Sequence, residues 1–245
     1  MGNLIKVADG FHFLEGPRWH ENKLWFSDMH GYKVYNLDAA GNLSTLAEIP
    51  EQPSGLGWLP DGGLVIVSML DRKLMKLKDG ELSIHADMSH LTPYQCNDMV
   101  IAKDGTAYVG NFGTDSVESK IRKTCLISVT QEGETKICAD GLLFPNGSVI
   151  SPDGKELIVG ETFGGNLTSF QINESGELSH RTIWARVMPL HFKIITSIIR
   201  LLNIPLKESN RTPFPVPDGI CLDSDNGIWV ASPTTAEVIR YKKGG

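Results

Sequence analysis

Residues Phe144 to Glu161 read FPNGSVISPDGKELIVGE, and this stretch decides the fold. Two short runs rich in β-branched residues flank Ser151-Pro152-Asp153-Gly154. Proline holds φ at about −65° in such a turn, and glycine accepts the positive φ that the turn needs. Short apolar runs on both sides of a tight turn predict a β-hairpin. The hairpin recurs along the chain, each time with a different polar residue near the start of its first strand.

Four further stretches repeat this pattern, and they begin at Glu15, Pro53, Cys96 and Pro217. More strand-like runs follow each hairpin, and the first three spacings between second strands are 40, 42 and 51 residues. Such spacings are typical of the four-stranded blades of a β-propeller. We therefore expect an all-β chain in which residues 1–245 form a single propeller domain. Tryptophans 19, 25, 58 and 229 fall on strand positions and are expected to pack between blades.

The N-terminal run Leu4 to Ala8 resembles the outermost strand of each repeat. It is therefore expected to complete the last blade, so that the sheet has no free edge where the ring closes. The sequence then predicts twenty strands, which fit either five closed blades or a six-bladed ring lacking one blade. The strand count alone leaves both arrangements open.

The last spacing is 71 residues, and the surplus over the blade period lies in residues 186–212. Its centre is apolar, is bounded by Pro189 and Pro205, and carries polar residues at roughly helical spacing. We expect an inserted amphipathic helix packed on the propeller. The run is too short to span a bilayer. The alternatives to a packed helix are a lid over a pocket and a contact with a membrane surface.

Composition narrows the function classes. The formal net charge of −6 argues against nucleic-acid binding, which needs clustered lysine and arginine. The first residues contain no apolar segment of the kind found in signal peptides, so a cytoplasmic location is expected. The four cysteines, Cys96, Cys125, Cys138 and Cys221, have no metal-binding spacing and are expected to be free thiols.

The start of each first strand carries the candidate chemistry. The first strand of a propeller blade lines the central channel, and these positions hold Glu15, Asn97, Asn146 and Asp218, with Ser54 or Gly55 in the second repeat. Carboxylate and amide oxygens that converge on one axis predict a site for a hard cation such as Ca²⁺. Zn²⁺ prefers histidine or cysteine, and none of the seven histidines shares this register. Taken singly, each residue is also explained as the cap of a turn.

The motifs EGPRW, LWFSD, CND, FPNG, SPDG and PDGICLD resemble, in this order and spacing, those of the SMP-30/gluconolactonase/luciferin-regenerating-enzyme family. The resemblance covers nearly the whole chain outside residues 186–212. It implies a six-bladed propeller, with this chain stopping at Gly245 before the final strands. It also implies one divalent cation, most often Ca²⁺ with Zn²⁺, Mn²⁺ and Mg²⁺ as alternatives, on four ligands: Glu15, Asn97, Asn146 and Asp218.

The same resemblance implies a hydrolase of the lactonase type that opens small lactones of sugar acids, with Asp218 as general base. Asn97, Asn111 and Glu161 are expected to contact the substrate, and His30 and His191 are weaker candidates for the base. An organophosphate-type esterase on the same site is one alternative. A non-catalytic propeller that serves as a binding or scaffold module is a second, and an incomplete gene product that folds poorly is a third.

Overall fold

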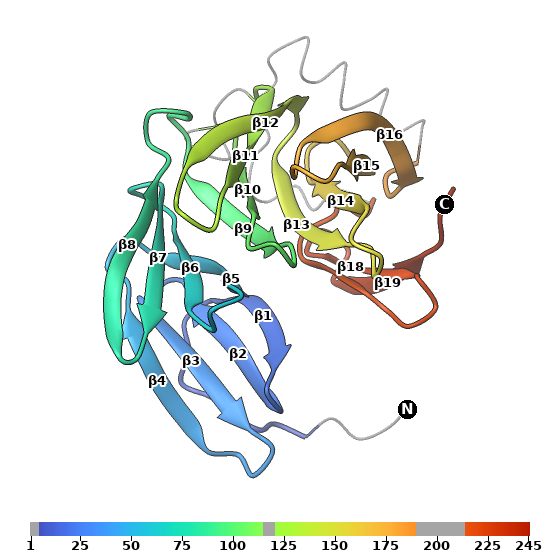
Figure 1. The fold of residues 1–245 in the computed structure, drawn as a ribbon. Coiled ribbons are helices and arrows are strands. Elements are labelled where there is room, and N and C mark those ends of the chain that lie inside the picture. The colour runs from blue at the N-terminus through green and yellow to red at the C-terminus, as the bar shows by residue number, and fades with distance from the viewer. Residues whose placement is uncertain (1–4, 115–120, 190–213) are drawn as a thin grey trace.

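The computed structural model describes residues 5–114, 121–189 and 214–245. Within these ranges the chain forms nineteen β-strands and no helix, which confirms the all-β prediction. The strands make five antiparallel sheets in chain order, four with four strands and the last with three. This is a five-bladed propeller arrangement, with the blades set around a common centre (Figure 1).

The bounds of the strands follow the predicted repeats closely. Blade 1 contains β1 (Leu14–His20), β2 (Lys23–Asp28), β3 (Lys33–Asp38) and β4 (Leu43–Glu48). Blade 2 contains β5 (Pro53–Trp58), β6 (Leu64–Ser68), β7 (Lys73–Lys78) and β8 (Glu81–Asp87). Blade 3 contains β9 (Cys96–Ile101), β10 (Ala107–Asn111), β11 (Thr124–Val129) and β12 (Thr135–Leu142). Blade 4 contains β13 (Pro145–Ile150), β14 (Glu156–Glu161), β15 (Asn166–Ile172) and β16 (Leu178–Arg186). Blade 5 contains β17 (Ile220–Leu222), β18 (Ile228–Ser232) and β19 (Glu237–Tyr241).

The hairpin of blade 4 forms for the reasons that its sequence indicates. Gly154 has a φ of 76° and donates its N–H to the Ser151 carbonyl over 2.8 Å, which closes the turn. The Ser151 hydroxyl bonds the Asp153 carboxylate at 2.6 Å and accepts the Glu156 N–H at 2.9 Å. A positive φ that only glycine adopts without strain, together with a hydroxyl that satisfies the turn, fixes this connection.

The hydrophobic core lies between neighbouring blades. Buried side chains of blades 2 and 3 form the largest cluster, and separate clusters join the other neighbouring pairs. Trp25 and Trp58 pack in the cluster between blades 1 and 2, as expected. The prediction is wrong for Trp19 and Trp229, which are 67% and 39% exposed. These two side chains come from the first and the last blade.

The first strands of consecutive blades pack on one another in the order β1, β5, β9, β13 and β17. Glycines permit the closest approaches. A Cβ atom on Gly147 would lie 2.5 Å from the Asp218 carbonyl oxygen, and one on Gly55 would lie 2.6 Å from the Met99 nitrogen. No comparable packing joins β17 to β1 in the parts of the chain that the structure describes. Among the described residues, blade 1 therefore packs against a neighbouring blade on one side.

Several expectations need correction or stay untested. Residues 5–8 form no strand, so within the described part of the run Leu4 to Ala8 the predicted closure of the last blade is wrong. The described residues form the five blades that the repeats predict, and they do not test the sixth blade that the family resemblance implies. The expected helix in residues 186–212 falls outside the described residues, apart from Arg186, which ends β16, and the three residues after it.

All four cysteines are free, as predicted. Among the described residues no helix is long and apolar enough to cross a membrane.

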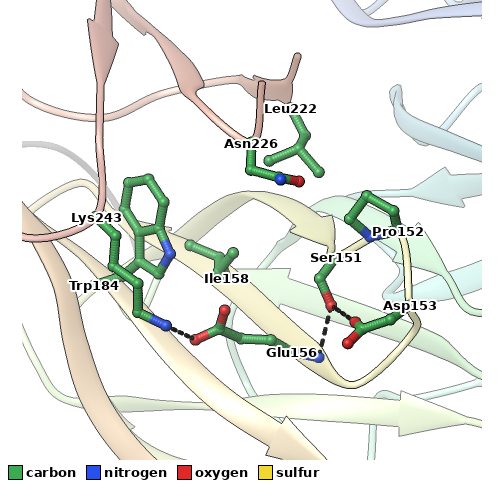
Figure 2. A pocket seen from close by; sticks show the side chains of 9 residues that line it. All are labelled: Ser151, Pro152, Asp153, Glu156, Ile158, Trp184, Leu222, Asn226 and Lys243. Atoms are coloured by element: carbon green, nitrogen blue, oxygen red, sulfur yellow. Dashed lines mark hydrogen bonds and ion pairs between the residues drawn. The ribbon is translucent and has the colours of Figure 1, made fainter. Parts of the chain in front are cut away.

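A cavity of about 380 Å³ lies between blades 4 and 5. Its wall includes the Ser151–Asp153 turn, the buried Trp184 and Asn226 (Figure 2). The turn follows the end of β13, whereas Asn146 lies near its beginning, so the cavity is at the opposite end of the blade from the predicted site. The Lys243 ammonium and the Glu156 carboxylate at its edge bond each other at 2.9 Å. This cavity contains none of the predicted site residues.

Candidate functional site

A β-bulge near the start of the first strand recurs in blades 1 to 4. In blade 4, Pro145 pairs with Glu161 and Ser148 pairs with Val159, so β13 carries one residue more than β14 over this interval. Blades 2 and 3 show the same one-residue shift at the matching place, and in blade 1 the shift starts one residue later. A bulge bends the strand and changes the direction of its side chains. In blades 2, 3 and 4 the extra position follows Pro53, Cys96 and Pro145, where Ser54, Asn97 and Asn146 stand.

Glu15 holds the matching position in blade 1. Leu14 pairs with Asp28, the last residue of β2, as Pro145 pairs with Glu161, the last residue of β14, so Glu15 matches Asn146. Asp218 directly precedes Gly219 and β17, as Asn146 directly precedes Gly147. We call Glu15, Ser54, Asn97, Asn146 and Asp218 the entry residues. The five residues therefore occupy equivalent positions in the five blades.

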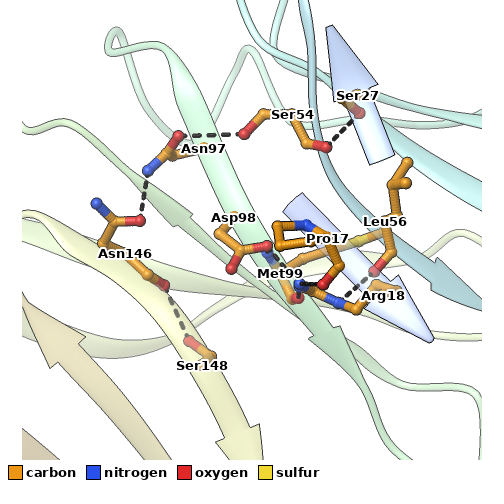
Figure 3. A network of polar contacts seen from close by, with 10 residues as sticks. All are labelled: Pro17, Arg18, Ser27, Ser54, Leu56, Asn97, Asp98, Met99, Asn146 and Ser148. Atoms are coloured by element: carbon orange, nitrogen blue, oxygen red, sulfur yellow. Dashed lines mark hydrogen bonds and ion pairs between the residues drawn. The ribbon is translucent and has the colours of Figure 1, made fainter. Parts of the chain in front are cut away.

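Hydrogen bonds connect the entry residues from blade to blade. The Ser27 hydroxyl donates to the Ser54 carbonyl at 2.7 Å, and the Ser54 hydroxyl donates to Asn97 Oδ1 at 3.2 Å. Asn97 Nδ2 donates to Asn146 Oδ1 at 2.8 Å, as Figure 3 shows. Asn146 Nδ2 then donates to Asp218 Oδ1, also at 2.8 Å. This chain of bonds runs through all five blades and ends on a carboxylate.

Carboxylates near the centre interact unfavourably. Burial, together with the charges of Asp218 and Asp98, raises the pKa of Glu15 to about 8. Burial and the charge of Asp98 also raise the pKa of Asp218, although the hydrogen bond from Asn146 opposes this shift. Carboxyl groups with raised pKa values are stabilised in their charged form by a cation placed between them.

The donor chemistry fits a hard divalent cation. Each asparagine Oδ1 accepts one hydrogen bond, which leaves one lone pair on each carbonyl oxygen, and both carboxylates keep free oxygen positions. Among the described residues, no group of three or more histidine, cysteine, aspartate and glutamate side chains is placed to hold a metal ion. A site here therefore depends on amide oxygens as well as carboxylates, which favours Ca²⁺ over Zn²⁺.

Asn111 and Glu161 belong to a second recurring set. The last residue of each second strand is polar and buried, and we call these five the turn residues: Asp28, Ser68, Asn111, Glu161 and Ser232. Asn111 bonds Gly113, Thr124 and Cys125 within blade 3. Glu161 accepts the Leu143 N–H at 2.8 Å, the Arg181 guanidinium at 3.0 Å and the Thr168 hydroxyl. Their polar atoms are thus engaged beside or within their own blades.

Of the two histidines considered as bases, the structure describes His30. His30 is exposed and contacts Gln52 at 3.4 Å. His191 lies outside the described residues. The structure adds residues that sequence reasoning missed. Thr162 accepts a hydrogen bond from Asn146 and donates to the Pro217 carbonyl at 2.7 Å.

Arg18 and Asp98 were also missed. Arg18 Nη2 donates to Asp98 Oδ1 at 2.6 Å, close to the entry residues. Asp98 stands where blades 2, 4 and 5 have Gly55, Gly147 and Gly219. The sequence therefore distinguishes Asp98 in one respect: it has a carboxylate where those three blades have glycine.

Known proteins resemble this chain in sequence and in fold. A protein of Sulfolobus acidocaldarius with no described function is 24% identical over 218 residues, which are 89% of this chain and 70% of the relative. The crystal structure of regucalcin, a calcium-binding protein from Agrobacterium tumefaciens, matches with a TM-score of 0.73 at 19% identity and covers 96% of this chain and 73% of that one. A gluconolactonase from Xanthomonas campestris matches with a TM-score of 0.70 at 21% identity and covers 97% of this chain and 78% of that one.

At these identities the solved structures establish the shared fold. The model of the SMP-30/gluconolactonase/LRE-like region matches residues 13–245, which include every entry residue. The chain belongs to the SMP-30/gluconolactonase/LRE-like family.

Proposed function

We propose that this protein is a hydrolase of the lactonase type that opens small lactones resembling those of sugar acids. The observation that carries the proposal is the convergence of the entry residues, joined by hydrogen bonds from Ser54 to Asp218. The family membership and a gluconolactonase of the same fold support the reaction class. A purely structural propeller has no need to gather two carboxyl groups whose pKa values are raised by burial.

The proposed cofactor is a divalent cation, with Ca²⁺ as the first choice. Glu15, Asn97, Asn146 and Asp218 would hold it through carboxylate and amide oxygens. When bound, the cation would polarise the lactone carbonyl and stabilise the oxyanion formed by water addition. A calcium-binding protein, regucalcin, has the same fold and supports this choice. Titration of the protein with each cation in turn distinguishes Ca²⁺ from the alternatives Zn²⁺, Mn²⁺ and Mg²⁺.

Asp218 is the proposed general base. Its Oδ1 accepts the Asn146 amide, which orients the carboxylate and leaves Oδ2 to take a proton from water. Burial raises the pKa of Asp218, and a more basic carboxylate removes that proton more readily. The oxygen of the water attacks the carbonyl carbon, the ring C–O bond breaks, and the proton passes to the leaving alkoxide. The product is the open hydroxy acid.

Among the entry residues, Asn97 is the proposed contact to the substrate, in addition to its proposed role as a ligand of the cation. Its side chain is 5% exposed and its amide is held at both ends, so it is rigidly placed. Substrate contact by Asn111 and Glu161 stays a prediction. The proposal gives these two residues a structural role, because their polar atoms are already bonded in blades 3 and 4. A cytoplasmic location is likewise a prediction.

The proposal is tested by the hydrolysis of a panel of small lactones and organophosphate esters. The purified protein is assayed with added Ca²⁺, after chelation, and after Ca²⁺ is restored. We expect lactone opening that chelation abolishes and Ca²⁺ restores. Hydrolysis of the phosphate esters alone would assign the esterase alternative. Cation binding without hydrolysis of either class would favour the non-catalytic binding module and contradict the proposal.

A further inference from the structure

Arg18 makes contacts that connect three blades. From β1 its Nε donates to the Leu56 carbonyl of blade 2 at 3.1 Å. Its Nη2 donates to Asp98 Oδ1 at 2.6 Å and to the Met99 carbonyl at 2.8 Å, both in blade 3. Figure 3 shows the guanidinium between these strands, with the Asp98 carboxylate beside it. A planar group with donors in a fixed fork holds several acceptors in one geometry.

This bridge lies where blade 1 has few other polar links to the centre. In β1 the bulge positions are Gly16 and Pro17, so blade 1 joins the chain of bonds that ends at Asp218 through the Ser27 hydroxyl of β2 and not through β1. Blade 1 packs on blade 2, and no comparable packing joins β1 to β17 among the described residues. The orientation of β1 therefore depends on its contacts with blades 2 and 3.

Asp98 is the matching half of the bridge. Its side chain is 8% exposed, and Oδ1 accepts both the Arg18 guanidinium and the Met99 N–H. The neighbouring Asn97 amide extends in the other direction, toward Asn146 (Figure 3). The bulge of β9 thus sends one side chain into the entry residues and the next to Arg18.

We infer that Arg18 is a positioning residue, which with Asp98 sets where Glu15 lies relative to Asn97 and so determines the affinity of the site for a divalent cation. Glu15 is three residues before Arg18 on the same strand, so a shift of β1 moves its carboxylate directly. This role rests on the proposed function, because Glu15 and Asn97 are cation ligands only under that proposal. Groups that orient metal ligands typically change metal affinity or activity about 10- to 100-fold when removed.

The test separates position from charge. The double variant Arg18→Met/Asp98→Asn removes one positive and one negative charge, so the net charge near the site is unchanged. The matched control is Arg240→Met/Asp223→Asn, which removes an ion pair of equal length, 2.6 Å, contained within blade 5. Ca²⁺ affinity is measured by isothermal titration calorimetry, and thermal unfolding of each variant is measured in parallel.

We expect the Arg18/Asp98 double variant to bind Ca²⁺ about 10- to 100-fold more weakly than the wild type, and the control to bind it unchanged. Arg18→Lys keeps the positive charge but lacks the forked donors of the guanidinium. The Ca²⁺ affinity of this variant should therefore fall between those of the wild type and the double variant. It also provides the test if the double variant does not fold. The inference would be overturned if the double variant bound Ca²⁺ as tightly as the wild type. If only Arg18→Lys folds, wild-type Ca²⁺ affinity in that variant would overturn it. An equal loss in the control would also overturn it.

A wild-type protein that binds no Ca²⁺ would refute the proposed cation site together with this role. A wild type that binds Ca²⁺ beside a double variant that binds it equally well would refute only the role of Arg18. The two failures are therefore distinguishable.

Discussion

The entry residues and the turn residues recur once per blade, are polar and lie at the same end of the propeller, yet they bond differently. Ser54, Asn97, Asn146 and Asp218 of the entry residues bond across blades, as Asn97 does to Asn146. Turn residues bond within or beside their own blade, as Asn111 does to Thr124 and Cys125. Bonds across blades bring side chains from distant parts of the chain to one place, where they can bind a ligand. Bonds within a blade satisfy buried polar groups and hold a turn.

The largest expected effect contrasts one carboxylate from each set. Asp218→Asn should lower the turnover of the responsive lactone about 10²- to 10⁴-fold, because the amide cannot accept the proton from water. Glu161→Gln, with the same isosteric change, should leave the turnover per folded molecule unchanged. Steady-state kinetics on both variants, corrected for the folded fraction, makes the comparison. Equal losses in the two variants would remove the distinction between the sets.

The second effect concerns two glycines that follow entry residues. A Cβ atom on Gly147 would lie 2.5 Å from both the Asp218 oxygen and the Ile220 nitrogen, whereas one on Gly219 meets nothing within 4 Å. Gly147→Ala should lower the free energy of unfolding by about 3 kcal/mol through overpacking. Gly219→Ala should change it little. Urea unfolding of both variants measures the difference, and a tolerated Gly147→Ala would contradict the close packing of blades 4 and 5.

The third effect tests the structural role of a turn residue. Asn111 is fully buried, and Asn111→Ala removes the partner of the Gly113 N–H, the Thr124 hydroxyl and the Cys125 carbonyl. Its loss should lower the free energy of unfolding by about 2 kcal/mol, because buried polar groups lose their partner. Urea unfolding measures this change, and lactone turnover by the folded fraction should persist. Loss of turnover without loss of stability would instead place Asn111 in the substrate site.

The smallest effect is a dependence of stability on pH in the cation-free protein. Burial raises the pKa of Glu15 from 4.5 to about 8, so the folded protein holds a proton that the unfolded chain releases in this range. The free energy of unfolding should therefore fall as the pH rises from 4.5 to 8. The change is modest because Glu15 is only half-buried and water screens its interactions.

One variant and one change of condition check this pH dependence of the free energy of unfolding. Glu15→Gln should remove the contribution, and so should saturation with Ca²⁺, because the cation stabilises the charged carboxylate. Urea unfolding at several pH values, with and without Ca²⁺, measures both. A slope of the same size in the wild type and in Glu15→Gln would show that another group is responsible.

Much of the fold could be predicted because its signals are local. The turn at Ser151–Gly154 and the short apolar strands on both sides of it specify the hairpin without reference to the rest of the chain. The run Leu4 to Ala8 looked equally strand-like, yet residues 5–8 have no strand partner in the structure. A strand needs a neighbour, and the presence of that neighbour is a long-range property. Trp19 and Trp229 were misplaced for the same reason, since each comes from a blade with one packed side.

The candidate site was predictable in its residue types and only partly in its geometry. Spacing from the turn placed Asn97 and Asn146 in one register, and the structure joins them by a hydrogen bond. In β1 the bulge follows Glu15 and so starts one residue later than in the other blades, a difference that has no distinctive sequence pattern. The Arg18–Asp98 pair spans 80 residues and links blades 1 and 3, so no local pattern could indicate it. For Asn111 and Glu161 the sequence does not separate a site role from a turn role, because turns and sites both use polar side chains.

The measurement that tests the central claim most directly is a Ca²⁺ titration by calorimetry of the wild type, Asn146→Ala and Asn111→Ala. These two asparagines are both buried, and they differ in whether they bond across blades. We expect one Ca²⁺ site in the wild type, loss of that site in Asn146→Ala and wild-type affinity in folded Asn111→Ala. Equal binding by all three proteins, or no binding by the wild type, would contradict the claim that the entry residues form the functional site.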